Sequence, residues 1–190
     1  MKIKMQVFKS KINGVFVVEP QVFGDERGYF MESFNKSKLE EAIGYDIDFV
    51  QDNESMSSKG VLRGFAFQKA PYTQAKLVRV TEGQLLDVVL DMRADSTTFG
   101  QYAIHKLSAK NKKQIFIPRG VAHAFITLSE TATLQYKVDH YFNAASEAGV
   151  IYNDADLKID WQMDASEIIV SEKDLSRPNF KQAEYFKEGF

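Results

Sequence analysis

The 190-residue chain is 44% hydrophobic and 13% aromatic, which predicts one globular domain over residues 1–190 with a sizeable core. Its formal net charge of -2 comes from 24 basic and 26 acidic side chains, and this balance gives no basic surface for nucleic acid or an anionic membrane. The chain has no cysteine and no apolar run of transmembrane length. We therefore expect a cytoplasmic protein without disulfides or thiolate chemistry.

The N-terminal segment predicts a β-hairpin. β-branched and aromatic residues over residues 5–19 flank Asn13-Gly14, a dipeptide typical of tight turns. Pro20 ends the second strand because proline cannot donate a backbone hydrogen bond to a neighbouring strand.

A polar loop and a single clear helix follow the hairpin. Residues 23–30 form a polar segment that returns into a short strand through Glu32. Asn35 is the expected N-cap of a helix over residues 36–43, which is rich in helix-forming residues and is closed by Gly44.

The stretch FVQDNESMSSKGVLRGFAFQKAPYTQAKLVRV, residues 49–80, places polar side chains inside strand-like apolar surroundings. Alternate residues of a strand point to one face, so regularly spaced polar residues form either the floor of a ligand site or an ordinary solvated face. The residues expected to share a face are Gln51 with Asn53, and Arg63 with Phe65 and Phe67.

The rest of the chain reads as short strands separated by turns at about ten-residue spacing, a pattern typical of an antiparallel sandwich or jelly roll that encloses a pocket. The tail beyond Ile151 has fewer strand signals, and we expect Trp161 to anchor it. The expected strands are residues 85–91, 101–107, 114–117, 123–128 and 133–140.

Metal and phosphate-loop motifs are missing from the sequence. The three histidines, His105, His123 and His140, form no His-x-His pair, so we expect no metal site. There is no nucleophile-elbow motif to support Ser-His-Asp chemistry and no glycine-rich phosphate loop of the kinase or nucleotidase type.

Several long motifs occur in a fixed order between Val15 and Asp174: VQDNESMSSKGVLRGFAFQ, QAKLVRVTEGQLLDVVLDMR, STTFGQY, IFIPRGVAHAF and IYNDADLKIDW. Over this range the sequence resembles the dTDP-4-dehydrorhamnose 3,5-epimerase family of the cupin superfamily. The resemblance implies an all-β, cupin-like jelly-roll sandwich or barrel with a few short helices. It also implies a homodimer that epimerises C3 and C5 of dTDP-4-keto-6-deoxyglucose, without a cofactor, to give dTDP-4-keto-rhamnose.

The resemblance assigns roles residue by residue. The position of the family's catalytic base is Ala66, the carboxylate that orients the base is Asp174, the lysine that holds the enolate oxygen is Lys76, and the tyrosine on the opposite face is Tyr136. Each of the last three has an ordinary alternative: a helix cap, a solvated lysine and a half-buried strand aromatic, respectively. The implied substrate-binding residues are Arg27, Glu32, Gln51, Asn53, Arg63 and His123, with Arg27 and Glu32 reaching the nucleotide of the partner subunit.

Ala66 departs from the family pattern. The family reads Arg-Gly-Leu-His-Tyr/Phe-Gln where this chain has Arg63-Gly64-Phe65-Ala66-Phe67-Gln68, and a methyl group cannot accept a proton. Three interpretations stay open. The chain is a 3,5-epimerase with impaired or lost activity, a natural variant with altered chemistry such as single-centre epimerisation or 3,4-ketoisomerisation, or a catalytically silent protein that binds nucleotide sugars.

Overall fold

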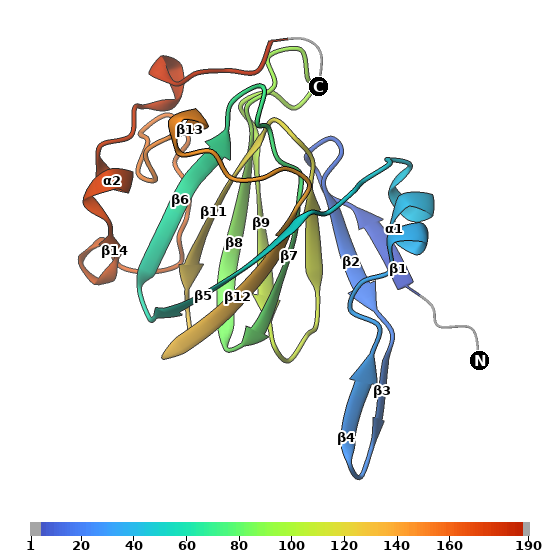
Figure 1. The fold of residues 1–190 in the computed structure, drawn as a ribbon. Helices are drawn as coiled ribbons and strands as arrows, with labels where there is room; N and C mark the ends of the chain where they lie inside the picture. Colours follow the sequence, from blue (N-terminus) through green and yellow to red (C-terminus); the bar gives the residue numbers. More distant parts are fainter. Residues whose placement is uncertain (1–4, 188–190) are drawn as a thin grey trace.

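Two sheets face each other in the computed structural model, which describes residues 5–187 (Figure 1). The first sheet has the order β1-β2-β10-β7-β12-β5, and the second has the order β13-β6-β11-β8-β9 with β14 beside β6. All pairings are antiparallel except β14 with β6. The expectation of an all-β sandwich is confirmed.

The element bounds agree with the predicted strands to within two or three residues. The first sheet contains β1 (Met5–Lys9), β2 (Phe16–Pro20), β10 (Gln114–Ile117), β7 (Lys76–Glu82), β12 (Thr131–Val138) and β5 (Gln51–Ser58). The second contains β13 (Glu147–Gly149), β6 (Val61–Gln68), β11 (Val121–Thr127), β8 (Gln84–Asp91), β9 (Tyr102–Ser108) and β14 (Ile169–Val170). A separate hairpin consists of β3 (Val22–Asp25) and β4 (Gly28–Met31).

Three apolar clusters hold the layers together. One lies between the sheets and includes Val78, Val89 and Phe125. A second covers the outer face of the second sheet, where the C-terminal tail packs through Trp161 against Phe65 with ring centroids 5.8 Å apart. The third lies under the first helix on the outer face of the first sheet.

The helix α1 (Lys36–Ile43) has the caps expected from the sequence. Asn35 accepts a hydrogen bond from the Lys38 amide, and Gly44 adopts the left-handed conformation that ends the helix. A second short helix, α2 (Glu172–Leu175), begins at Ser171, whose side chain accepts from the Asp174 amide. No helix among residues 5–187 is long and apolar enough to cross a membrane.

The β3–β4 hairpin extends away from the sandwich (Figure 1). Its aromatic side chains Tyr29 and Phe30 are 59% and 63% exposed. The hairpin therefore presents two large aromatic side chains to solvent outside the sandwich.

The expectation that Arg63 shares a face with Phe65 and Phe67 is wrong. Phe65 and Phe67 belong to the outer cluster, whereas Arg63 is the register partner of Phe125, which points between the sheets. The register of β6 against β11 shifts at this point, and Gly64 has a φ of +100°. A Cβ at Gly64 would stand 2.4 Å from the His123 carbonyl oxygen, so only glycine permits this close approach.

We predict that Trp161 is required for stability. Trp161→Ala removes the main apolar contact between the tail and Phe65 and should lower the free energy of unfolding by about 3–5 kcal/mol. Trp161→Phe keeps an aromatic ring but loses part of the buried surface and the hydrogen bond from Nε1 to the Tyr152 carbonyl, and it should cost about 1–2 kcal/mol. Urea unfolding followed by circular dichroism measures both.

The control is Ile169→Ala, because this side chain is 57% exposed and should contribute less than about 1 kcal/mol. Equal losses in Trp161→Ala and Ile169→Ala would contradict the anchoring role of Trp161.

Candidate functional site

A cavity of about 340 Å³ opens at one end of the sandwich, where β5 and β7 begin and β6 and β12 end. Both sheets contribute to its walls, and β strands place alternate side chains inward, so polar groups from distant parts of the chain meet there. The lining residues are Gln51, Asn53, Ala66, Phe67, Gln68, Gln74, Lys76, Tyr136, Phe142 and Glu147.

Two amide side chains fix the loop at the cavity mouth. Gln51 Oε1 accepts a hydrogen bond from the Phe142 amide at 3.3 Å, and Gln68 Oε1 accepts one from the Asn143 amide at 2.9 Å. Gln51 also donates to Asn53 Oδ1 at 2.8 Å, which confirms that these two share a face. The loop therefore holds the exposed ring of Phe142 against the cavity.

Lys76 and Tyr136 stand on the wall formed by the first sheet. The Lys76 ammonium lies 5.9 Å from the centre of the Tyr136 ring and has no hydrogen-bond or ion-pair partner among residues 5–187. Burial lowers the pKa of Lys76 to about 8, although Asp87 and Glu147 act in the opposite direction. Burial raises the pKa of Tyr136, so its phenol keeps its proton at neutral pH.

A histidine–aspartate pair lies beside the cavity, on the second sheet. His123 is the register partner of Ala66 across β11 and β6, and its Nε2 lies 2.6 Å from Asp87 Oδ2. The two residues are 8% and 0% exposed. Both point between the sheets, because Val121 and Phe125 on β11 and Leu85 and Val89 on β8 belong to the inner cluster.

A chain of ion pairs lies behind β6 and β13. Arg177 donates through Nε to Asp174 Oδ1 at 2.7 Å and through Nη2 to Glu147 Oε1 at 2.9 Å. Burial alone raises the pKa of Glu147, but the hydrogen bonds from Lys173 and Arg177 outweigh it and hold that pKa below its usual value. Glu147 is therefore an ionised carboxylate at the cavity wall.

The sequence model of the family described as dTDP-4-dehydrorhamnose 3,5-epimerase matches residues 9–182. The chain belongs to this family. The Escherichia coli K12 enzyme of that name is 48% identical over 170 residues, which cover 90% of this chain and 91% of the relative.

Solved structures agree with this assignment. The epimerase of Elizabethkingia anophelis NUHP1 is 49% identical with a TM-score of 0.90, over 93% of this chain and 97% of that one. The dTDP-6-deoxy-D-glucose-3,5-epimerase of Legionella pneumophila Philadelphia 1, solved with dTDP-4-keto-L-rhamnose, is 41% identical with the same TM-score, over 94% of both chains. These neighbours support the cupin-like fold of this epimerase-family chain.

The structure brings half of the ten predicted site residues together in one cavity. Gln51, Asn53, Ala66, Lys76 and Tyr136 line one cavity. The remaining predicted residues lie beside it, behind it or away from it, as the next two paragraphs describe.

Arg63 and His123 lie beside the cavity. Arg63 points between the sheets and donates through Nε to Ser57 Oγ at 3.1 Å. Asp174 lies behind β6 instead, where its Oδ2 accepts only a long hydrogen bond of 3.4 Å from the Gly64 amide. The donor, Gly64, is two residues before Ala66 in β6.

Arg27 and Glu32 lie outside the cavity of their own chain. Arg27, at the tip of the β3–β4 hairpin, pairs with Asp25 and has an 85% exposed side chain. Glu32 accepts from Lys38 Nζ at 2.7 Å near the start of α1. Neither side chain reaches the residues that line the cavity of the same chain.

Sequence reasoning missed Asp87, Glu147 and Arg177. Asp87 carried a signal, because a single carboxylate inside the apolar run LLDVVL must be buried with a partner. Glu147 and Arg177 carried none, since charged residues in a loop-rich tail are usually solvated and only the fold packs this tail against β6.

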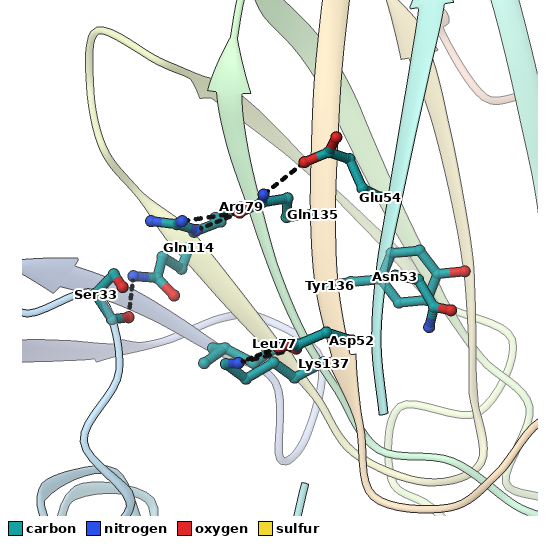
Figure 2. Close-up of a pocket in the computed structure, with 10 residues that line it drawn as sticks. All are labelled: Ser33, Asp52, Asn53, Glu54, Leu77, Arg79, Gln114, Gln135, Tyr136 and Lys137. Carbon is teal, nitrogen blue, oxygen red and sulfur yellow. Dashed lines mark hydrogen bonds and ion pairs between the residues drawn. The ribbon is translucent and has the colours of Figure 1, made fainter. Parts of the chain in front are cut away.

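A second cavity, of about 250 Å³, lies on the outer face of the first sheet (Figure 2). Arg79 donates to Gln135, which donates to Glu54, and Lys137 pairs with Asp52. The polar side chains that Figure 2 draws in this cavity are hydrogen-bonded or ion-paired with one another, apart from Asn53 and Tyr136. These two side chains point toward the other side of the sheet.

We predict that Lys76 destabilises the fold. Its lowered pKa means that the folded state binds the proton less tightly than the unfolded state, so the penalty is complete below pH 8 and disappears as the pH rises towards 10.5. Lys76→Met should raise the free energy of unfolding at pH 7 by at most about 3 kcal/mol, since the side chain is only half-buried and solvent screens part of the cost.

Urea unfolding at pH 7 and pH 10 measures this effect, and the gain should shrink at the higher pH. Lys59→Met, at an exposed position, is the control and should change stability by less than about 0.5 kcal/mol. A loss of stability in Lys76→Met at pH 7 would contradict the prediction.

Proposed function

We propose that the chain binds a dTDP-4-keto-6-deoxyhexose between its sheets and catalyses epimerisation at C3 and C5 through an enolate, as a step of dTDP-rhamnose biosynthesis. One observation carries the proposal. An unpaired lysine and a protonated tyrosine line the same cavity as amides that suit a sugar, in a chain of the 3,5-epimerase family.

The chemistry requires three groups. The hydrogens on C3 and C5 of the sugar are both α to the C4 carbonyl, so removing either one leaves negative charge on the C4 oxygen. Lys76 suits that oxygen, because below pH 8 it is a half-buried cation without a protein partner among residues 5–187. Tyr136 suits the return of a proton, because its phenol is held in the protonated state.

The remaining requirement, a base, is not met at Ala66. We propose that proton abstraction is slower here than in relatives with histidine at this position, because general-base catalysis typically contributes about 10²–10⁴-fold. Binding is preserved, since Ala66 removes no group that contacts phosphate. Exchange at only one of the two carbons would support the single-centre alternative.

We predict that dTDP binds to the chain as it stands. Phe142 offers an exposed aromatic face for the base, and Arg63 offers a cation at the cavity edge. Calorimetry should detect binding below millimolar concentration, and Arg63→Gln should weaken it. Lys59→Gln is the matched control on an exposed lysine. No binding at millimolar dTDP would overturn the proposed function.

We predict that Ala66→His raises the rate of proton exchange by about 10²–10⁴-fold. Asp174 Oδ2 is occupied only by the long bond from the Gly64 amide and is available to orient an imidazole at position 66. Deuterium incorporation at C3 and C5 of dTDP-4-keto-6-deoxyglucose, followed by NMR, measures the rate. Ala66→Ser, which fills space without supplying a base, should show no gain.

We further propose a cytoplasmic homodimer in which the β3–β4 hairpin completes the cavity of the partner subunit. Support comes from Arg27 and Glu32, which lie outside the cavity of their own chain, and from the exposed Tyr29 and Phe30. Light scattering should give the mass of a dimer, and Arg27→Ala should weaken dTDP binding without changing that mass. A stable monomer that binds dTDP with full affinity would contradict this arrangement.

A further inference from the structure

A buried acid–base pair stands beside the position where the family's base is replaced by a methyl group. His123 Nε2 and Asp87 Oδ2 are 2.6 Å apart, and Asp87 has no other hydrogen-bond partner among residues 5–187. A carboxylate that is 0% exposed would be costly to bury in an apolar sheet without a strong partner. His123 is therefore the partner that makes the burial of Asp87 tolerable.

Asp87 fixes where the imidazole carries its proton. A carboxylate accepts hydrogen bonds, so His123 Nε2 carries the hydrogen and the free lone pair is on Nδ1. His123 Nδ1 has no hydrogen-bond partner among residues 5–187. The fully buried side-chain atoms without a partner in this range are Asp87 Oδ1 and Thr127 Oγ1, and Nδ1 is not one of them. His123 Nδ1 therefore keeps contact with solvent.

The register of the sheet places this ring next to the cavity. His123 is directly opposite Ala66, and opposed residues of antiparallel strands project from the same face with Cβ atoms about 4.5–5.5 Å apart. Ala66 lines the cavity, so the His123 ring lies beside the cavity wall at a position where the side chain is only a methyl group. Lys76 and Tyr136 occupy the opposite wall.

We propose that His123, oriented by Asp87, is the base that removes the proton α to the ketone in this chain. The inference rests on the proposed function, and it moves the base one strand away from the family position, to β11. Nδ1 takes the proton as the C–H bond breaks, and the electron pair enters an enolate whose charge lies on the C4 oxygen beside Lys76. Tyr136, on the other wall, supplies a proton to the opposite face, and His123 loses its proton to solvent as the tyrosine is reprotonated.

The experiment measures deuterium incorporation into dTDP-4-keto-6-deoxyglucose at saturating concentration, with dTDP affinity measured by calorimetry in parallel. The unaltered chain should exchange slowly but measurably. His123→Gln and Asp87→Asn should each lower that rate at least about 100-fold, and the double variant should fall no further. Asp87→Asn should leave dTDP affinity within about threefold, because Asp87 does not line the cavity.

Two further variants separate a base from a structural histidine. His105→Gln is the matched control: His105 points into the same interior from β9, hydrogen-bonds Ser10 and does not line the cavity, so exchange should be unchanged. In Ala66→His, the new imidazole supplies the base. His123→Gln should then have little effect, whereas a purely structural or substrate-binding role would lower the rate in both backgrounds.

The outcomes are distinct. The proposal is supported if His123→Gln and Asp87→Asn each lose exchange in the chain with Ala66, and if His123→Gln keeps exchange in the Ala66→His background. Unchanged exchange in His123→Gln and Asp87→Asn overturns it, as does dTDP binding without any exchange by the unaltered chain, and either result leaves the proposed binding function intact. Failure to bind dTDP overturns the proposed function together with this inference.

Discussion

The pairing of β6 with β11 decides which side chains meet inside the sandwich. At Gly64 the two strands approach so closely that a Cβ would collide with the His123 carbonyl, and the register shifts there. The shift turns Phe65 outward to Trp161 and brings Ala66 inward opposite His123. Without it, strict alternation would bury Phe65 where the cavity lies and would send residue 66 to the outer cluster.

The polar interior is tolerated because its charges compensate one another. Lys76 has no direct partner, but Asp87 and Glu147 both favour its charged form and oppose the effect of burial. Glu147 in turn is neutralised from behind by Arg177 and Lys173, so the wall carries little net charge. A cavity of this kind is ready for an anion to develop beside Lys76 without large rearrangement, which is the condition for electrostatic catalysis.

Most of the fold and part of the site could be predicted from the sequence, for identifiable reasons. Strand alternation and turn residues located the strands, and the caps Asn35 and Gly44 located α1. The face of Phe65 was predicted wrongly, because a register shift depends on contact with β11, which is distant in sequence. The ion pair of Asp174 with Arg177 could not be predicted either, because it depends on how the C-terminal tail packs against β6.

The comparison of Ala66 with His123 shows why binding and proton transfer are separable in this architecture. The groups suited to holding a nucleotide sugar come from β5, β7, β12 and the loop at Phe142, and none of them depends on the side chain at position 66. Proton transfer requires only one basic atom on the β6–β11 wall, and neighbouring strands of a sheet present equivalent inward positions about 5 Å apart. A base lost from β6 can therefore be replaced from β11, provided that a carboxylate stands behind the histidine, and in this chain Asp87 occupies that position.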